Sequence, residues 1–303
     1  MTEVALRRFS TADLDALRPA VERARQAGEF GGSSDPDGSF FLRSFDFMDH
    51  PVELAVGPDG AVVGFISPEF KVVVVRPEDR GQGIGRRLVE AGLDIERARG
   101  RPNLILGVLP ADTAGQAFLR AVGLTFHSTL WDLALPADTA VAGPTWPAEI
   151  EARPFDRSTD GRPFIALFNA AFASHATPLQ MDESMADRPP EPGFEDADTI
   201  VAVDRGNGEL VGFCATSPER TDGVVGSHAE IWTIGVRPDR QGAGLGRQLL
   251  RWGVQRLRAI GVRDVSLSVN GRNEHALGLY ESEGFVRQST RERWNRPVAG
   301  TGG

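Results

Sequence analysis

Residues 233–249 read TIGVRPDRQGAGLGRQL, and this stretch decides the fold of the chain. A β-rich run leads directly into a glycine-rich turn, and the turn leads into an amphipathic helix expected over residues 247–259. Residues 72–88 read VVVVRPEDRGQGIGRRL, which repeats the pattern 161 positions (233 − 72) earlier. The sequence therefore predicts two copies of one supersecondary unit.

The register of this repeat holds without a gap from residue 72 to residue 123. The same offset pairs Gly100 with Gly261, Asp112 with Asn273, and Gly123 with Gly284. Each copy also predicts two hairpin-linked strands before the turn, and a strand and a short helix after it. The strands are expected over residues 52–56, 61–66 and 104–108, and over residues 199–203, 210–215 and 264–269. The short helices are expected over residues 114–121 and 273–280.

Length and patterning divide the chain into two domains of ordinary size. We expect an N-terminal domain over residues 1–134 and a linker rich in Ala, Pro, Gly and Thr over residues 135–147. A second domain is expected over residues 148–296, followed by a disordered tail over residues 297–303. Strands that alternate with helices predict a mixed α/β architecture in both domains.

Composition excludes several classes of function. The chain has 33 Lys and Arg against 42 Asp and Glu, a net charge of −9, which argues against general nucleic-acid binding. One cysteine, Cys214, rules out an intramolecular disulfide and favours a reducing, cytoplasmic location. No apolar run predicts a signal peptide or a membrane span, and the histidines lack metal-ligand spacing. The expected protein is a monomer or homodimer without a metal.

A strand that runs through a glycine-rich turn into a helix presents free backbone N–H groups to an anion. The helix dipole adds positive potential there, and glycine lets a ligand approach closely. The spacing excludes a Walker loop, because no Lys follows the glycines, and it does not fit the Gly-x-Gly-x-x-Gly pattern of dinucleotide folds. A diphosphate site of another type remains, beside the alternative of a purely structural turn.

Three features together resemble the GNAT acyltransferase superfamily. Arg80-x-x-Gly83-x-Gly85 and Gln241-x-x-Gly244-x-Gly246 look like its Gln/Arg-x-x-Gly-x-Gly/Ala signature. A Val-Arg-Pro sequence precedes each turn, and NxxAxxLYxxxGF follows the second at residues 273–285. The resemblance implies two tandem domains, each a mixed and mostly antiparallel sheet flanked by helices, in which a splayed pair of parallel strands holds acetyl-CoA as cosubstrate.

The same resemblance implies a set of cofactor-binding residues. The backbones of Ile234 and Val236 would bond to pantetheine, and Asn273 would contact the coenzyme arm or act only as a helix cap. The turn amides would hold the pyrophosphate: Gln241, Gly242, Ala243, Gly244, Leu245, Gly246 and Arg247. The first copy can bind a second cofactor or serve as a scaffold, and its corresponding residues are Val75, Arg80, Gly81, Gln82, Gly83, Ile84, Gly85 and Arg86.

The resemblance places the chemistry in the second copy. Tyr280, the only tyrosine, falls on the family's general-acid position, whereas the first copy has Leu119 there, which cannot donate a proton. Glu230 is the expected base, although Glu69 occupies the equivalent place in the first copy. Asp112 replaces Asn273, and a carboxylate suits an anionic cofactor poorly. We expect the first copy to be non-catalytic.

The acceptor is expected to be the primary amine of a small molecule. Among tandem members the chain resembles the mycothiol synthases of actinobacteria, which implies a cysteinyl amine of a sugar-inositol precursor. The supporting sequences are NAAFASH at residues 169–175 and EIWTIGV at residues 230–236, but residues 176–182 depart from that pattern. A catalytically silent acyl-CoA sensor and a protein-lysine acetylase remain as alternatives.

Overall fold

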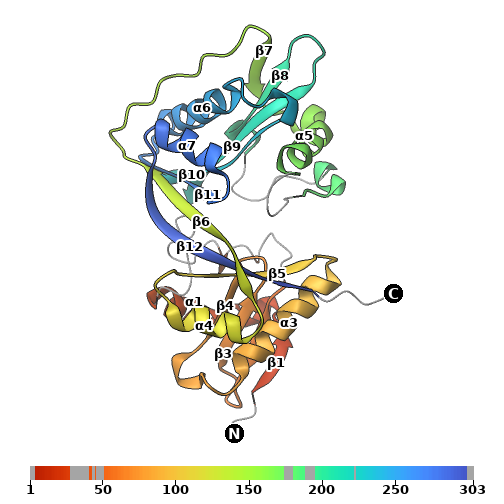
Figure 1. Ribbon diagram of the computed structural model, residues 1–303, viewed down its shortest axis with the longest axis vertical. Coiled ribbons are helices and arrows are strands. Elements are labelled where there is room, and N and C mark those ends of the chain that lie inside the picture. The colour runs from red at the N-terminus through yellow and green to blue at the C-terminus, as the bar shows by residue number, and fades with distance from the viewer. Residues whose placement is uncertain are drawn as a thin grey trace. The chain divides into compact units, whose positions relative to one another are not determined.

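The computed structural model describes residues 4–27, 41–42, 45, 51–173, 180–187, 195–221 and 223–298 (Figure 1). Within it the chain forms two compact units. Unit 1 comprises Met1–Trp131 together with Ser289–Gly303, and unit 2 comprises Asp132–Gln288. The copies expected from the repeat therefore lie in different units.

Unit 1 is an α/β unit with two groups of paired strands. Strands β1 to β4 pair in sequence order, each antiparallel to the next. The remaining strands pair in the order β5-β12-β6. Its elements are β1 (Ala5–Arg8), α1 (Leu14–Gln26), β2 (Glu53–Val56), β3 (Val62–Ser67), β4 (Val72–Val75), α3 (Ile84–Ala98), β5 (Asn103–Val108), α4 (Thr113–Ala121) and parts of β6 (Thr125–Leu135) and β12 (Val286–Pro297).

Alternation along the strands separates the two cores of unit 1. Phe65 and Leu54 face α1 and pack with its Leu17, whereas Ile66 and Ala55 face α3 and pack with its Leu88. Since successive strand residues point to opposite faces, the hydrophobic runs in β2 and β3 serve both helices at once. The sheet of unit 1 is therefore covered on both sides (Figure 1).

Unit 2 repeats this plan with strands paired in the order β6-β11-β10-β9-β8-β7. All of these neighbours for which the register is known are antiparallel except β10 and β11, which run parallel. Its elements are β7 (Ile150–Pro154), α5 (Arg157–Phe172), β8 (Thr199–Asp204), β9 (Leu210–Thr221), β10 (Val224–Val236), α6 (Leu245–Ala259), β11 (Asp264–Asn270) and α7 (Glu274–Ser282).

The two faces of the unit 2 sheet carry different helices. Phe213 is fully buried against α5, where it packs with Phe168 and Phe172. The neighbouring Gly212 faces α6, since a Cβ at that glycine would lie 3.0 Å from Leu249. The sheet thus lies between α5 on one side and α6 on the other (Figure 1).

Two long strands belong to both units. The domain limits predicted at residues 134 and 296 did not allow for such shared strands. Strand β6 begins in unit 1 and ends in unit 2, and β12 begins in unit 2 and ends in unit 1. Residues 292–297 of β12 pair antiparallel with β5, and Trp294 is buried in the core beneath α3. Pro297 and Val298, placed in the predicted tail, are ordered, since the Val298 N–H donates to Pro102 O. Residues 299–303 lie outside the described residues.

The predicted linker is packed rather than free. Three side chains of α6 hold it along unit 2: Gln248 accepts from the Thr145 N–H at 2.7 Å, Gln255 donates to Val141 O at 2.6 Å, and Arg258 donates to Pro136 O. Most predicted elements agree with the structure to within two residues, but β9 continues six residues beyond its predicted end at 215. No helix among the described residues is long and apolar enough to cross a membrane.

Candidate functional site

The parallel strands β10 and β11 pair only at one end and then separate. Their ladder covers residues 228–230 of β10 and residues 264–266 of β11, although both strands continue, to Val236 and Asn270. Glu230 is the last β10 residue in this ladder, opposite Ser266. An opening between two parallel strands therefore begins directly after Glu230, as the splayed pair in the predicted fold requires.

The backbone of β10 directs hydrogen-bonding groups toward this opening. The Arg237 N–H donates to Val211 O of β9, and backbone groups of successive strand residues point to alternate sides. Residues 235 and 233 therefore face β9, while Ile234 and Val236 direct their N–H and C=O groups toward β11. These are the two residues expected to bond to pantetheine through their backbones.

The glycine-rich turn after β10 has the conformation that an anion site needs. Gly242 and Gly244 have φ of 81° and 83°, a left-handed conformation that favours glycine, and Gly244 caps α6 without any side-chain cap bond. A Cβ at either glycine would meet no atom within 4 Å, so the space in front of the turn is open. Residues 241–244 are exposed, which leaves the first-turn amides of α6 accessible to a ligand.

The first residue of the motif closes the turn through its side chain. Gln241 Nε2 donates to Val236 O at 3.0 Å, and in unit 1 Arg80 Nε donates to Val75 O at 2.9 Å. These residues correspond across the repeat, so Gln and Arg have the same structural role, because each ties the turn to the end of the preceding strand. Sequence reasoning treated the Gln241 position as a ligand only and missed this role.

Asn273 acts as the helix cap that the sequence offered as one alternative. Its Oδ1 accepts from the Ala276 N–H at 3.1 Å at the start of α7. Asp112 caps α4 in the same way, accepting from the Gly115 N–H at 2.8 Å. The Asn-to-Asp difference between the copies therefore preserves the cap, while it adds a negative charge to unit 1.

Tyr280 lies in the last turns of α7, with its ring 6.2 Å from that of Phe285. The residue is partly accessible, yet the protein atoms around its hydroxyl raise the pKa of the phenol above its usual value by desolvation. The nearby thiol of Cys214, which lies opposite Ile234 in the β9–β10 ladder, raises that pKa further. The phenol therefore stays protonated at neutral pH.

The carboxylates at equivalent positions of the two units have different surroundings. Glu230 is a half-buried strand residue at the mouth of the opening. Glu69 instead lies in the turn between β3 and β4, where it accepts from Arg99 at 2.9 Å and from Arg101 at 3.1 Å. These arginines hold the pKa of the Glu69 carboxyl below its usual value, against the effect of its burial. Glu69 is thus committed to ion pairs in unit 1.

Unit 2 also has a β-bulge that the sequence did not reveal. Ile231 pairs with Thr216 and Thr233 pairs with Ala215, so Trp232 is an extra residue that β10 inserts into its ladder with β9. Trp232 is 46% exposed. The β3–β4 ladder of unit 1 runs from Ser67 opposite Val72 to Gly64 opposite Val75 without any such shift. A hydrophobic pattern contains no signal for a bulge, because the residues keep their types.

A buried carboxylate after the end of α7 forms ion pairs with two arginines of α6. Glu283, whose side chain is 5% exposed, accepts from Arg247 and from Arg251, the latter at 2.9 Å. The two arginines hold the pKa of this carboxyl below its usual value although burial opposes them. Arg247, expected in the cofactor set, therefore has its side chain engaged, and its backbone N–H in the first turn donates to Gly244 O.

The corresponding turn in unit 1 keeps the same backbone. Gly81 and Gly83 have φ of 76° and 80°, and the space in front of both is open. Its first helical turn is more crowded, because the Phe118 ring lies 2.9 Å from the place of a Cβ on Gly85. At the equivalent Gly246 the nearest side-chain atom is 3.8 Å away. Leu119, at the position of Tyr280, is buried in the core of unit 1.

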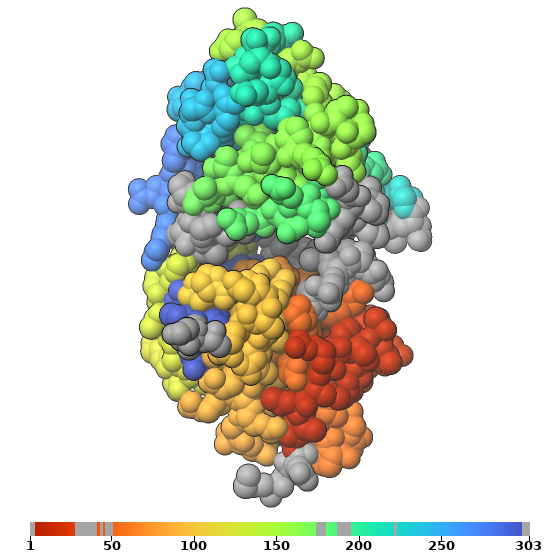
Figure 2. Space-filling view, turned by 90° about the vertical axis from the view of Figure 1, so that its right-hand side faces the viewer, coloured from red at the N-terminus to blue at the C-terminus, as the bar shows by residue number. Residues whose placement is uncertain are grey.

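The segment that precedes β8 carries acidic side chains on its surface. Asp182 and Glu183, at the start of the short helix η3 (Glu183–Asp187), are exposed, and η3 lies on the visible green surface in Figure 2. His175, residues 176–179 of the departing stretch and residues 188–194 lie outside the described residues. No cluster of His, Cys, Asp and Glu among the described residues is arranged to hold a metal ion.

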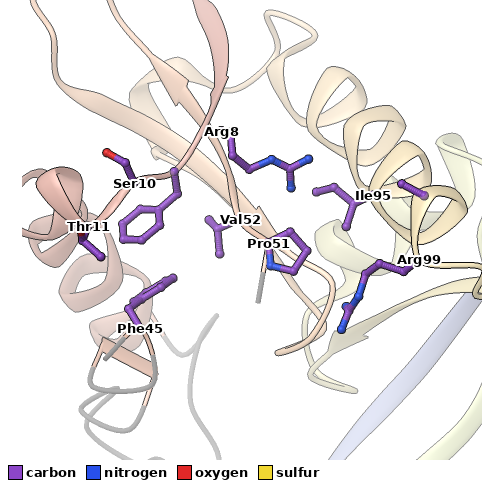
Figure 3. Close-up of a pocket in the computed structure, with 10 residues that line it drawn as sticks. Arg8, Ser10, Thr11, Phe45, Pro51, Val52, Ile95 and Arg99 are labelled. Atoms are coloured by element: carbon purple, nitrogen blue, oxygen red, sulfur yellow. The ribbon is translucent and has the colours of Figure 1, made fainter. Parts of the chain in front are cut away.

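One further pocket lies in unit 1 and belongs to neither turn. It has a volume of about 430 Å³, with Arg8 and Arg99 on its rim and Phe9, Val52 and Ile95 among its apolar walls (Figure 3). Strand β1 ends and β2 begins at this pocket, whereas the Gly-rich turn follows the end of β4. Because β2 is antiparallel to both β1 and β3, and β3 to β4, the pocket and the turn lie at opposite ends of the sheet.

Comparison with known proteins agrees with this geometry. Residues 23–124 and 162–285 each match the model of the acetyltransferase (GNAT) family, one match for each copy of the repeat. The chain is 33% identical over 285 residues to the mycothiol acetyltransferase of Thermobispora bispora, covering 92% of this chain and 90% of that protein.

Two solved structures share the whole tandem fold. A GCN5-related N-acetyltransferase from Sphaerobacter thermophilus superposes with a TM-score of 0.72 at 22% identity, over 98% of this chain and 96% of that chain. A tandem GNAT protein from the clavulanic acid biosynthesis pathway, solved without AcCoA, gives 0.69 at 18% identity, over 99% and 100%. Repeat, splayed strands and glycine-rich turns thus have one common explanation: the chain belongs to the GNAT family of N-acetyltransferases and contains two domains of that fold.

Proposed function

We propose that unit 2 transfers the acetyl group of acetyl-CoA to the primary amine of a small molecule. The observation that carries the proposal is the opening between β10 and β11, which starts at Glu230 and leads to an exposed glycine-rich turn. A carboxylate, strand groups that face the opening and an anion-binding turn thus follow one another along a single strand. Such an arrangement suits a long thioester cosubstrate with a diphosphate at one end.

The turn and the strand would hold acetyl-CoA through their backbones. The amides from Gly242 to Gly246 lie at the start of α6, where the helix dipole favours a diphosphate, while those of Gln241 and Arg247 donate to Pro238 O and Gly244 O. The open space before Gly242 and Gly244 fits such a group, since no side chain fills it. Ile234 and Val236 face the opening and would bond to pantetheine, with Asn273 nearby as the cap of α7.

Glu230 and Tyr280 would move the protons of the reaction. An ammonium must lose a proton before its nitrogen can attack a carbonyl, and Glu230 is the carboxylate at the mouth of the opening. The departing thiolate needs a proton, and the raised pKa of the Tyr280 phenol keeps one available at neutral pH. The bulge at Trp232 bends β10 at this same place, two residues beyond Glu230.

Unit 1 would bind acetyl-CoA through Val75 and the turn from Arg80 to Arg86 without turning it over. The turn has the same left-handed glycines and the same open space as that of unit 2. The proton donor is absent, because Leu119 replaces Tyr280, and Glu69 is held by Arg99 and Arg101. Unit 1 thus retains what binding requires and lacks what turnover requires.

The acceptor is best sought first among thiol-containing amines. The relative in Thermobispora bispora is named a mycothiol acetyltransferase and matches over nine-tenths of both chains, which supports a mycothiol precursor as the first candidate. The cysteinyl amine implied by the sequence resemblance is a primary amine of the required kind. Other amino sugars and amine antibiotics form the comparison group.

The test is product formation with a panel of primary amines. The chain is incubated with acetyl-CoA labelled in the acetyl group, free thiol release is followed, and labelled amides are identified by mass spectrometry. We expect stoichiometric thiol and amide with at least one small amine, and higher kcat/KM for it than for lysine peptides. Acetyl-CoA binding without any amide product would contradict the proposal and favour a sensor.

A further inference from the structure

Lys71 is the only lysine of the chain, although Lys and Arg together number 33. It is also the only non-glycine residue of the described part with a positive φ, at 59°. Left-handed backbone is unfavourable for a side chain with a Cβ, and such outliers concentrate at functional sites. The single lysine therefore occupies an unusual place, which the proposed function does not use.

That place corresponds to the acetyl end of the unit 2 site. The repeat offset pairs Lys71 with Trp232, the extra residue of the β10 bulge. Lys71 O accepts from the Gly107 N–H of β5 at 2.7 Å, whereas β4 and β5 belong to different sheets beyond this point. Lys71 thus lies where the strands of unit 1 begin to separate.

The spacing from the glycine-rich turn is the same in both units. Lys71 precedes Val75 by four positions, and Trp232 precedes Val236 by four positions, which is ~14 Å of strand in each case. The backbone oxygens of Val75 and Val236 accept hydrogen bonds from the Arg80 and Gln241 side chains at the start of each turn. A thioester cosubstrate seated in the first turn would therefore bring its acetyl group close to Lys71.

Lys71 is half-buried as a residue, its amine is desolvated, and within the described residues this amine forms no ion pair with a carboxylate. Its Nζ donates to Glu69 O at 3.0 Å. Desolvation is the largest effect on this amine, followed by the charge of Arg293 in β12. Together with Arg101, and against Glu69 and Glu96, they lower the pKa of Lys71 to about 8. At pH 7 about a tenth of this amine is thus neutral, far more than for an ordinary lysine.

We propose that Lys71 is a self-acetylation site, modified by the acetyl-CoA that the first glycine-rich turn holds. The inference rests on the proposed function, because it requires acetyl-CoA in that turn. The neutral Nζ attacks the thioester carbonyl, an N–C amide bond forms, and the C–S bond breaks. The proton that the nitrogen loses ends on the departing thiolate through water, so the products are Nζ-acetyl-Lys71 and free CoA. Because each chain is acetylated only once, the reaction can be slow and does not require a general acid such as Tyr280.

The single lysine makes this modification directly readable. A lysine-specific endoprotease cuts the denatured chain once, after Lys71, and acetylation of Lys71 abolishes the cut. We expect wild type incubated with acetyl-CoA to become largely resistant to this protease. Mass spectrometry of the peptide that contains Lys71 should show one acetyl group, and Lys71→Arg should take up none there.

Three controls separate a bound from a free reagent. Gly83→Trp, which blocks the first turn, and an excess of CoA on wild type should each lower the rate of acetylation at least tenfold. Gly244→Trp should leave that rate unchanged while it abolishes transfer to external amines. The rate should rise about tenfold per pH unit below pH 8 and level off above it, because only the neutral amine reacts.

Equal acetylation in urea-denatured chain, or an undiminished rate with excess CoA, would overturn the proposal, since the reaction would then be non-specific. The CoA competition keeps the test valid even where Gly83→Trp fails to fold. Calorimetry that shows acetyl-CoA in the first turn, together with an unmodified Lys71, would overturn the inference and leave the proposed function intact. Absence of acetyl-CoA binding altogether would remove both.

Discussion

A phenol and a carboxylate carry the proposed chemistry, and each has a counterpart in unit 1 that cannot do the same work. Leu119 is buried at the position of Tyr280, and Glu69 is tied to two arginines at the position of Glu230. The repeat thus provides an internal comparison for each catalytic residue.

Tyr280→Phe should lower kcat by about 10²–10⁴-fold with little change in the acetyl-CoA dissociation constant. The ring and its contact with Phe285 remain, and only the proton for the departing thiolate is lost. Stopped-flow or steady-state thiol release, together with calorimetry, gives both numbers. A variant with full kcat would remove the phenol from the mechanism.

Glu230→Gln should lower kcat/KM for the amine by at least about 10²-fold near neutral pH. The loss should shrink at a pH above the pKa of the amine, where the free base needs no removal of a proton. Glu69→Gln is the matched control, and it should leave transfer in unit 2 unchanged. A pH profile of all three proteins distinguishes a proton acceptor from a residue that only stabilises the strand.

The sequence alone could propose Tyr280 and Glu230 as the catalytic candidates, because each is a chemically distinctive residue in a motif. It could not distinguish Glu230 from Glu69, since the two lie at equal positions of the repeat. Their difference arises from Arg99 and Arg101, which reach Glu69 from the end of α3 and the loop after it. Such partners depend on tertiary packing and leave no local pattern.

At the scale of elements, the strand, turn and helix of each motif act as one piece. The bond from Gln241 to Val236 O fixes the turn to its strand, and Arg80 makes the same bond to Val75 O. The motif therefore tolerates either residue for a physical reason: each carries an N–H donor long enough to reach back five positions.

Gln241→Ala should weaken acetyl-CoA binding to unit 2 by about 3- to 10-fold. The variant loses the side-chain hydrogen bond that keeps the turn ordered against its strand. Gln241→Arg should restore most of that affinity, because arginine already closes the turn of unit 1. Calorimetry on both variants measures the difference. Equal loss in the two would show that the glutamine amide contacts the ligand itself.

The repeat also allowed the helices and strands around each turn to be predicted, since periodicity and glycine stops are local signals. The bulge at Trp232 and the short, regular β4 were not predictable. Both depend on how a strand registers with its neighbour, and neither changes the hydrophobic pattern.

In the whole molecule, unit 1 is not one continuous stretch of the chain: it contains both the first residues and the last ones. The end of β12 follows the second copy in sequence, yet it pairs with β5 in unit 1. Trp294, 3% exposed, packs there under Arg120 and against Phe126. Domain boundaries drawn from the repeat could not show this, because strand pairing is a non-local property.

Trp294→Ala should destabilise unit 1 by about 3–5 kcal/mol, the usual range for a buried tryptophan replaced by alanine. Urea denaturation should show an early transition, and hydrogen exchange should assign it to β5. Val286→Ala on the same strand, at a residue that is 45% exposed, should change stability by less than about 0.5 kcal/mol. A Trp294→Ala protein in which β5 keeps its protection would contradict this role of β12.

The most direct test of the proposed function is the rate of acetyl transfer to a small amine in two matched variants, Gly244→Trp and Gly83→Trp. Each places a bulky side chain in the open space before one glycine-rich turn. We expect Gly244→Trp to abolish transfer, and Gly83→Trp, correctly folded by circular dichroism, to retain the wild-type kcat. Transfer that survives Gly244→Trp and disappears in Gly83→Trp would place the chemistry in unit 1 and contradict the proposed role of unit 2.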